Sequence, residues 1–409
     1  MAGLIDPRVH DAQAVRQAGP DLLGLALLDA RNTTLAWLAA FDGLAPDIAL
    51  DDFDPPAWLA GHAGWFQERW IARHVQRNRG AACDPQSPRL PSIEPDADAW
   101  FDPHERGRRQ RWTAAAPDPQ AVRRYLAATL EATLELLDKA PSDAQALHFF
   151  RLALYREDRI GEQFAVLAQA LDLAPERWPS GWAAPPARVR REAIGLPAQR
   201  VRLGAADADE TAWRPAIEDG RCDEEVPEFE IDAQPVSWGQ WLEFIDDGGY
   251  DCPAWWGDDG GDWVETHGRR APRYVEQQAG GISARRGGRL QKLPAAQAVL
   301  HVSWYEARAW CRWAGRRLPA EAEWVLARRA AAGRGFTWGD ALEWVADRAA
   351  RWPGARAAPG EDDELLAAGR RVLRGASLAA GGRLRHPGAR RFAAPGSDEQ
   401  FCGFRSCAL

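Results

Sequence analysis

The chain has 409 residues, 46% of them apolar and 27% charged, a composition typical of a globular protein with more than one domain. Its net charge of −8 argues against a nucleic acid or an anionic membrane as partner, and no apolar run approaches the ~20 residues of a membrane span. Residues 1–17 lack a basic region followed by an apolar stretch, and six scattered cysteines do not form a disulfide framework, so we expect a cytoplasmic protein.

Two long helices are expected first. The first has leucines at helical spacing that predict one apolar stripe, formed by Leu25, Leu28, Leu35 and Leu38. The second begins after Pro55 and Pro56 and carries an aromatic face, formed by Trp58, His62, Trp65 and Phe66. The chain holds 21 tryptophans, and we expect most of them in cores or cleft walls because indole rings bury a large apolar area.

Two more helices follow. Asp118 and Pro119 are typical of an N-cap and a first helical position, and they precede a third stripe formed by Val122, Leu126, Leu130, Leu134 and Leu137. Ser142 or Asp143 is expected to cap the fourth helix, whose inward seam is Phe149, Leu152, Arg156, Ile160, Phe164, Leu167 and Leu171. Four amphipathic helices predict a four-helix bundle over residues 1–172.

The texture of the sequence changes after the fourth helix. Residues 173–190 are rich in proline and tryptophan without a sustained period, which predicts a linker. Residues 191–409 contain short alternating segments, glycine pairs and turn residues, with helices expected over 303–315 and after Pro319. The predicted fold class is therefore α+β, with an all-helical domain ahead of a domain of low regular-structure content.

The second half contains eight short motifs in order over residues 229–405. They are Phe229-x-Ile231-Asp232-x-x-Pro235-Val236-Ser237, Gly248-Gly249-Tyr250, His301-Val302-Ser303-Trp304-x-Glu306-Ala307, Arg317-Leu318-Pro319-x-Glu321-x-Glu323-Trp324, Trp338-Gly339-Asp340, Glu343-Trp344, Leu373-Arg374-Gly375-x-Ser377 and Gly403-Phe404-Arg405. Together they resemble the formylglycine-generating-enzyme (sulfatase-modifying factor) domain, which implies a C-type-lectin-like fold. A DinB-like bundle ahead of such a domain resembles the non-haem iron synthases of ergothioneine and selenoneine.

The resemblance implies an iron site. In these synthases a histidine on the second helix and a His-x-x-x-His pair on the fourth hold Fe(II), with positions left open for O2 and substrate. His62 matches the first ligand, whereas Arg156 and Ile160 occupy the other two positions. Neither can bind iron, because a guanidinium stays protonated and isoleucine has no donor atom.

The resemblance also implies small-molecule substrates. These are trimethylhistidine (hercynine) and a donor that is a thiol or, in the selenoneine branch, a selenosugar. Ergothioneine-type relatives carry an Asp and an Arg that bind a charged donor. The corresponding segment here, residues 391–398, has alanine at the Asp position, which favours a neutral selenosugar. The residues expected in the substrate cleft are Tyr155, Glu157, Asp158, Arg159, Trp344, Arg383, Arg385, Arg391 and Phe392.

Three functions follow from these patterns. The first is O2-dependent formation of a C–Se or C–S bond on the imidazole of hercynine, with Fe(II) as cofactor. The second is a metal-free homologue that binds a betaine or a sugar-like ligand, because aromatic residues suit quaternary ammonium groups. The third is copper-dependent oxidation of a protein cysteine, suggested by the spacing of Cys402 and Cys407, although two ordinary buried cysteines are the simpler interpretation. The sequence indicates no oligomeric state.

Arg156 and a cluster of arginines near the C-terminus each have two alternative interpretations. Arg156 lies on an inward seam, where it is expected either to pair with Glu68 or Glu157 or to bind an anionic ligand in the former metal pocket. A basic cluster near the C-terminus is expected either to anchor substrate or to form a solvated face, and it consists of Arg383, Arg385, Arg390 and Arg391.

Overall fold

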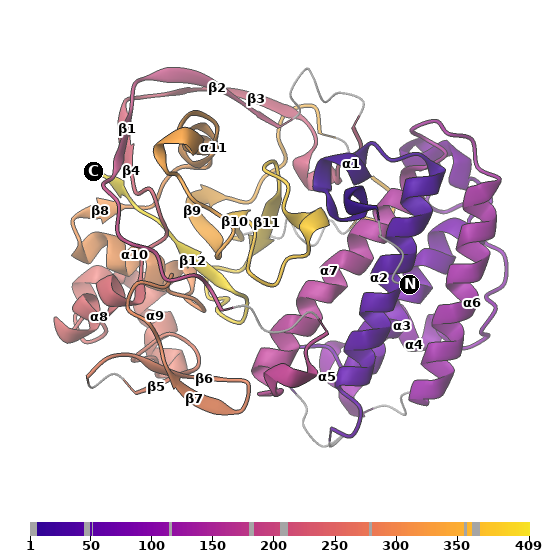
Figure 1. Cartoon of the computed structure of the whole chain (residues 1–409), viewed down its shortest axis with the longest axis horizontal. Coiled ribbons are helices and arrows are strands. Elements are labelled where there is room, and N and C mark those ends of the chain that lie inside the picture. The colour runs from indigo at the N-terminus through magenta and orange to yellow at the C-terminus, as the bar shows by residue number, and fades with distance from the viewer. Residues whose placement is uncertain are drawn as a thin grey trace.

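The computed structural model describes residues 6–44, 50, 52–113, 117–179, 184–204, 212–277, 280–355, 358–361 and 369–409. Its N-terminal half is helical and its C-terminal half mixes short strands with helices (Figure 1). The helices of the first half are α1 (Ala12–Arg16), α2 (Pro20–Ala40), α3 (Pro56–Gln67), α4 (Ala97–Phe101), α5 (Arg108–Thr113), α6 (Pro119–Asp138) and α7 (His148–Ala170). None of the helices in these ranges combines the length and the apolarity of a membrane span.

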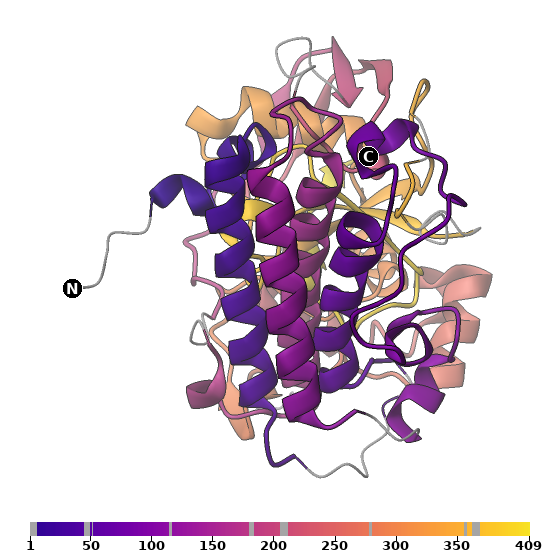
Figure 2. The same cartoon turned by 90° about the vertical axis from the view of Figure 1, so that its right-hand side faces the viewer.

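The four long helices form the expected bundle. α3 packs against α6 and α7, and α2 packs against the same two helices (Figure 2). A π-helical turn, η2 (Glu68–Ala72), extends α3. The seam predicted for α7 is confirmed, since Phe149, Ile160 and Phe164 are all buried. Apolar burial along these four helices stabilises the N-terminal half.

The apolar stripe predicted for α2 is right for Leu35 and Leu38, which pack in or against the core, and wrong for the other two leucines. Leu25 and Leu28 are 48% and 39% exposed, whereas the neighbouring face of the helix is buried. The reason is Arg31, which is 1% exposed and forms an ion pair with Glu157 of α7. This pair turns the face of Leu27 toward the bundle, and the two outer leucines are left in contact with solvent.

The predicted start of the fourth helix is also shifted. α7 begins at His148, and Asp143 instead accepts hydrogen bonds from the backbone N–H groups of Gln145 and Ala146, both at 3.0 Å. Asp143 therefore stabilises the turn before the helix, as a short acidic side chain commonly does. Asp118 is confirmed as the N-cap residue of α6 by position, with Pro119 at the first helical position.

The C-terminal half contains four helices and thirteen short strands among the described residues. The helices are α8 (Trp238–Asp246), α9 (Gly257–His267), α10 (Trp304–Trp313) and α11 (Glu321–Ala330). The strands are β1 (Ile194–Leu196), β2 (Gln199–Gly204), β3 (Arg221–Val226), β4 (Phe229–Ile231), β5 (Val275–Gln277), β6 (Ser283–Arg286), β7 (Arg289–Lys292), β8 (Arg316–Arg317), β9 (Leu342–Arg348), β10 (Arg371–Gly375), β11 (Arg390–Ala393), β12 (Cys402–Phe404) and β13 (Cys407–Ala408).

These strands form small sheets rather than one large one. The two four-stranded sheets have the orders β1-β4-β13-β8 and β11-β10-β9-β12, and β9 pairs with β12 in parallel. Two of the sequence motifs contain helix caps: Ser237 and Ser303 form capping boxes at the starts of α8 and α10. Trp241, Trp324 and Trp344 are fully buried, which confirms the expectation that tryptophans fill the cores.

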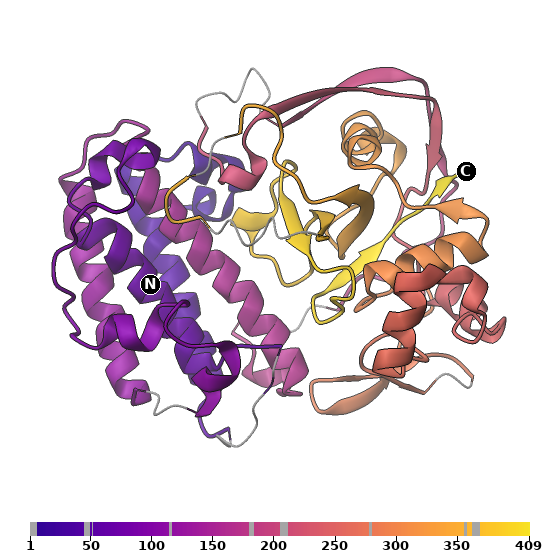
Figure 3. The ribbon, with the colours of Figure 1, turned by 180° about the vertical axis from the view of Figure 1, so that it is seen from behind.

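The two halves share an apolar interface. Leu300, Ala341 and Phe401 of the C-terminal half belong to the same buried cluster as the bundle core. α7 is the bundle helix that faces the C-terminal half (Figures 1 and 3). Its side chains therefore decide what lies between the bundle and the second half.

Candidate functional site

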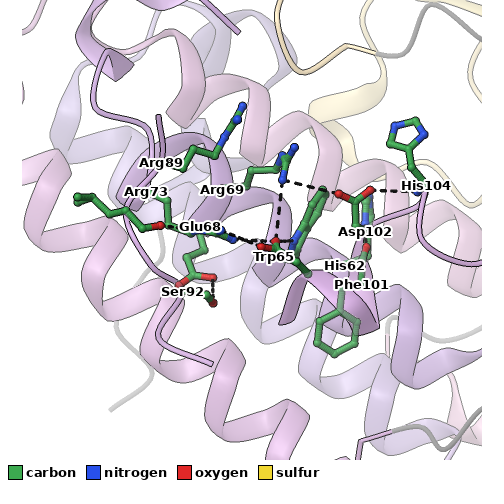
Figure 4. Close-up of polar contacts among 12 residues, drawn as sticks. His62, Trp65, Glu68, Arg69, Arg73, Arg89, Ser92, Phe101, Asp102 and His104 are labelled. Atoms are coloured by element: carbon green, nitrogen blue, oxygen red, sulfur yellow. Dashed lines mark hydrogen bonds and ion pairs between the residues drawn. The ribbon is translucent and has the colours of Figure 1, made fainter. Parts of the chain in front are cut away.

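His62 lies at the centre of α3 and is 4% exposed. Its ring stacks on Trp58 at 4.7 Å and on Trp65 at 5.4 Å between ring centroids. Its Nδ1 lies 2.9 Å from the backbone carbonyl oxygen of Phe101, as Figure 4 shows. Because a carbonyl only accepts, Nδ1 carries the proton and Nε2 presents its lone pair.

The guanidinium of Arg156 lies next to that lone pair. Its Nη2 lies 3.3 Å from Nε2 of His62, and its guanidinium carbon lies 4.9 Å from the ring centroid of Phe66. The guanidinium donates and the imidazole accepts, so a fixed positive charge lies at the atom that would otherwise bind a metal. Ile160 is one helical turn further along α7, buried at 3% exposure, and contributes only apolar surface.

The predicted partners of Arg156 are bound elsewhere. Glu157 accepts hydrogen bonds from Arg31 at 2.7 Å and from Thr34 at 2.8 Å. Glu68 accepts them from Ser92, from the backbone N–H of Ile93 and from the Tyr125 hydroxyl, each at 2.7 Å. The expectation that Arg156 pairs with Glu68 or Glu157 is therefore wrong, because buried donors inside the bundle already saturate both carboxylates.

A ladder of ion pairs holds the end of α3 and its π-helical turn. Arg73 donates to both carboxylate oxygens of Asp98 at 2.8 Å, and Trp65 donates to the same carboxylate at 2.6 Å. Arg69 lies 3.7 Å from Asp102 (Figure 4). The two arginines, with burial opposing them, lower the pKa of Asp98 to about 2. This ladder fixes the segment 98–102, and with it the carbonyl that sets the tautomer of His62.

Most of the residues predicted for the substrate cleft join the two halves. Asp158 of α7 accepts hydrogen bonds from Arg383 at 2.6 and 2.8 Å, and Asp29 of α2 accepts one from the same guanidinium at 2.7 Å. Burial of Asp158 raises its pKa, and Arg383 opposes that shift. Asp158, Glu157 and Arg383 line one pocket of about 380 Å³ between α2, α7 and residues 378–383.

A second contact lies on the adjacent face of α7. Arg391 donates to the Tyr155 hydroxyl at 3.1 Å and to Glu162 at 3.5 Å, and Arg159 donates to Glu162 at 2.7 Å. Tyr155, Arg156 and Arg159 remain half-buried. The structure therefore brings together the predicted cleft residues of α7 with Arg383 and Arg391.

The solvated-face interpretation of the basic cluster is wrong for Arg390 and Arg391, whereas Arg385 is exposed. Arg390 and Arg391 are 2% and 5% exposed, and Arg390 forms a bidentate ion pair with Glu321. Arg385 donates to the carbonyls of Ala380, Gly339 and Ser377 at 3.1–3.2 Å. The guanidinium groups of Arg390 and Arg391 bind the protein itself, since a buried cation without partners is very costly.

Trp344 and Phe392 are wrong as cleft residues. Trp344 is 0% exposed and donates its indole N–H to the carbonyl of Val302 at 2.8 Å. Phe392 is 6% exposed and packs in a cluster of the C-terminal half under the Arg390 guanidinium at 4.9 Å. Trp344 lies on the central strand β9 and Phe392 on the edge strand β11 of the same sheet, and both rings pack into hydrophobic clusters of the C-terminal half.

The His62 position does not fit an iron ion. Of the three family ligand positions, one holds an imidazole whose lone pair contacts a guanidinium, and the other two hold arginine and isoleucine. Across the described part of the chain, no three His, Cys, Asp or Glu side chains converge in a way that would hold a metal ion. His148, the one histidine of α7, is turned toward Trp213, which donates to its Nδ1 at 3.2 Å, and burial lowers its pKa to about 4.

The cysteines fit structural roles. Cys402 and Cys407 are both buried, and they belong to different hydrophobic clusters of the C-terminal half. Burial raises the pKa of both thiols. A copper site needs thiolates that share one ion, and two protonated thiols in separate clusters do not provide it.

Sequence reasoning missed three groups at this site. The carbonyl of Phe101 has no side-chain signal and cannot be found from a sequence. Arg31 is a charged residue within an apolar helix, and this pattern is a signal that could have indicated a buried ion pair. Glu361 lies close enough to Arg156 to interact with its charge and accepts a hydrogen bond from the backbone N–H of Ala216 at 2.6 Å; burial raises its pKa to about 8.

One comparison with known proteins concerns the C-terminal half, and another concerns most of the chain. Residues 185–353 match the family model of the sulfatase-modifying factor enzyme 1-like domain. The hercynine oxygenase of Mycolicibacterium thermoresistibile is 31% identical over 357 residues, 85% of this chain and 73% of that protein.

Two further relatives extend the comparison. The hercynine oxygenase of Mycobacterium tuberculosis is 30% identical over 315 residues, 75% of this chain and 69% of that protein. The formylglycine-generating enzyme of Streptomyces coelicolor is 60% identical, but over only 45 residues, 11% of this chain. The similarity to the first group spans both halves, and the chain therefore belongs to the hercynine oxygenase family, whose second half is a domain of the formylglycine-generating-enzyme type.

Proposed function

We propose that this chain binds a hercynine-type betaine between the helical bundle and the C-terminal half, at a site that has no iron. The observation that carries the proposal is the 3.3 Å contact between Nη2 of Arg156 and Nε2 of His62. In this arrangement a guanidinium provides the positive charge that a metal ion would otherwise place beside His62. The substrate class comes from the relatives, which are named hercynine oxygenases.

The half-buried face of α7 has the chemistry that such a ligand requires. Hercynine carries a quaternary ammonium group, a carboxylate and an imidazole. The Tyr155 ring, in edge contact with Trp213 at 5.8 Å, suits the ammonium group. Arg156 and Arg159 suit the carboxylate, because guanidinium groups bind carboxylates through charge-assisted hydrogen bonds.

Calorimetric titration of the chelator-treated protein with hercynine tests this proposal. We expect binding without metal, and at least about tenfold weaker binding in Arg156→Gln, which removes the charge. Arg289→Gln is the matched control because Arg289 lies on β7, far along the chain, and pairs weakly with Glu176 at 3.7 Å. Absence of hercynine binding to the metal-free protein, or equal loss in the two variants, would overturn the proposal.

A second candidate is the activity that the family resemblance implies, O2-dependent C–Se or C–S bond formation on hercynine with Fe(II). One observation favours it: the hydrogen bond from His62 to the Phe101 carbonyl selects the tautomer that leaves Nε2 for a metal. The donor would be a selenosugar or a thiol, and the bundle over residues 1–172 would be of the DinB type, joined through a 173–190 linker to the second domain at 191–409. Oxygen consumption with Fe(II), hercynine and either donor would establish this candidate in place of the first.

A further inference from the structure

A pocket of about 240 Å³ lies where the N-terminal segment meets the C-terminal half. α1 contributes one wall, α11 another, and residues 386–388 a third; Figure 1 shows α1 between the bundle and the C-terminal half. The pocket does not include His62, Arg156 or Ile160. It is therefore centred away from the proposed betaine site, although Trp213 contributes to both.

The lining of this pocket is strongly basic. Its charged side chains in the described part of the chain are Arg16, Arg214, Glu218, Arg328, Arg329 and Arg374. Glu218 is the sole acid among them, and Arg16 neutralises it through an ion pair of 2.7 Å with both side chains buried. In a protein with a net charge of −8, such a local excess of guanidinium groups is a specific feature.

The positive charge and the N–H donors of Arg374 are only partly matched by acceptors within the protein. It is 1% exposed and shares the single carboxylate of Glu321, at 3.3 Å, with Arg390. Its Nε–H has no acceptor among the residues that the structure describes. Burial lowers its pKa to about 10, with Glu321 opposing the shift and Arg390 adding to it. A buried donor without a partner, in the wall of a pocket, is where an external acceptor gains most.

Arg328 projects from α11 into the same pocket. It is half-buried, and its guanidinium makes no hydrogen bond or ion pair within the described ranges. Burial and the neighbouring Arg329 both lower its pKa. Arg328 therefore carries a positive charge that the protein itself does not compensate.

We propose that this pocket binds a phosphate group, as free inorganic phosphate or as the phosphate of a small phosphomonoester. Guanidinium groups that converge from α11 and β10 match the several acceptor oxygens of a tetrahedral dianion better than they match a planar carboxylate. The volume lies below the roughly 300–1,000 Å³ of pockets for larger ligands, which favours a compact anion. The pocket lies outside the α7 face that carries the proposed betaine site, so this inference does not depend on the proposed function.

Calorimetric titration of the full chain at constant ionic strength tests this inference. The probes are inorganic phosphate and glucose 6-phosphate, and the variant is Arg328→Gln, which removes one charge without breaking a contact within the protein. We expect phosphate to bind and the variant to bind at least about tenfold more weakly, in line with the loss of a charge-assisted contact. Arg289→Gln, which removes an exposed charge on β7, should leave the affinity unchanged.

The outcomes separate cleanly. Tighter binding of the sugar phosphate than of inorganic phosphate supports a phosphomonoester ligand, and equal binding supports phosphate alone. Failure of both probes to bind at millimolar concentration overturns the inference, as does an equal loss in Arg328→Gln and Arg289→Gln, which would show general screening. Hercynine titration of Arg328→Gln should match the wild type, so failure of the betaine proposal would be recognised separately.

Discussion

At the scale of single residues, the central feature is a guanidinium at a position where the family resemblance leads us to expect a metal-binding imidazole. A neutral His62 accepts from Arg156, and its other nitrogen donates to Phe101, so both ring nitrogens are satisfied in a buried position. The stacking of His62 on Trp58 and Trp65 does not depend on iron. Retention of His62 is therefore no evidence for a metal.

Restoring the two histidines should restore a metal site. Arg156→His with Ile160→His places two imidazoles at i and i+4 on α7, facing His62. We expect this double variant to bind Fe(II) at least about tenfold more tightly than Arg156→Gln, which frees Nε2 without supplying a ligand. Anaerobic titration checks the affinity, with far-ultraviolet circular dichroism to verify the fold. Equal affinities would show that the pocket has changed beyond these two positions.

Glu361 should make stability depend on pH. Burial, with Glu218 adding to it, raises its pKa from 4.5 to about 8. A raised carboxyl pKa means that the folded state favours the protonated form, so stability present below pH 4.5 is lost as the pH rises toward 8. Glu361→Gln stays neutral and keeps an acceptor for Ala216. Its advantage over wild type should therefore grow by about 4 kcal/mol between pH 5 and pH 9.

Chemical unfolding at several pH values measures this difference. The control is Glu225→Gln, which changes an exposed carboxylate of β3. The control should give the same offset from wild type at every pH. An offset for Glu361→Gln that is equally independent of pH would contradict the assignment of Glu361 as a buried, protonated group.

At the scale of elements, β9 and β12 are joined by a buried ion pair. Arg405 and Glu343 are both 0% exposed, with Nε and Oε2 at 2.5 Å, and Trp324 donates to the same carboxylate at 2.9 Å. Arg405 also donates to the carbonyl of Asp232 at 2.9 Å. The pair therefore links the end of β12 to the central strand β9 of the same sheet. The contact with Asp232 links it also to the residue that follows β4.

Breaking that pair should be costly. Arg405→Met leaves the Glu343 carboxylate buried and without its cation, and the free energy of unfolding should fall by about 3–5 kcal/mol. Arg289→Met breaks an exposed pair with Glu176 and should change it by no more than about 1 kcal/mol. Urea denaturation distinguishes the two. A similar small loss for both variants would contradict the structural role given to Arg405.

Local signals predicted much of the element scale. The seams of α6 and α7 and the caps Ser237 and Ser303 depend on neighbours three or four residues away, so the sequence shows them directly. The stripe on α2 was wrong for Leu25 and Leu28 because the ion pair from Arg31 joins residues 126 positions apart. The spacing of apolar residues does not reveal such a pair, and the many leucines of α2 are compatible with either of two buried helix faces.

The same limit applies to the site. The positions of His62, Arg156 and Ile160 on facing helices followed from their register. The contact between His62 and Arg156 spans 94 residues, and that between Asp158 and Arg383 spans 225. Sequence alone therefore placed Arg156 beside the wrong acids. Trp344 was assigned to a cleft because tryptophan serves cores and clefts alike, and only packing decides between them.

At the scale of the whole molecule, α7 joins the two halves. Arg383 reaches from the C-terminal half to Asp158 of α7 and Asp29 of α2, with its side chain 9% exposed. The two halves also meet through the apolar contacts of Phe401 and Leu300 with the bundle core. The site beside Arg156 lies along this same junction, so its geometry depends on how firmly the halves are joined.

Removing Arg383 should loosen that junction. Arg383→Met removes the arginine partner of two carboxylates, and we expect faster amide hydrogen exchange in α7 and in residues 378–384, with smaller changes in α6. Arg200→Met, which affects an exposed pair with Asp223 inside the C-terminal half, serves as the control. Uniform changes across all helices would indicate general destabilisation instead and contradict a local role for Arg383.

The claim on which the account depends is that a guanidinium has replaced iron at His62. Anaerobic equilibrium dialysis of the wild-type chain against Fe(II), followed by metal analysis, tests it most directly. The account predicts far less than one iron per chain, and the same result for His62→Ala. One tightly bound iron per chain that His62→Ala abolishes would contradict it.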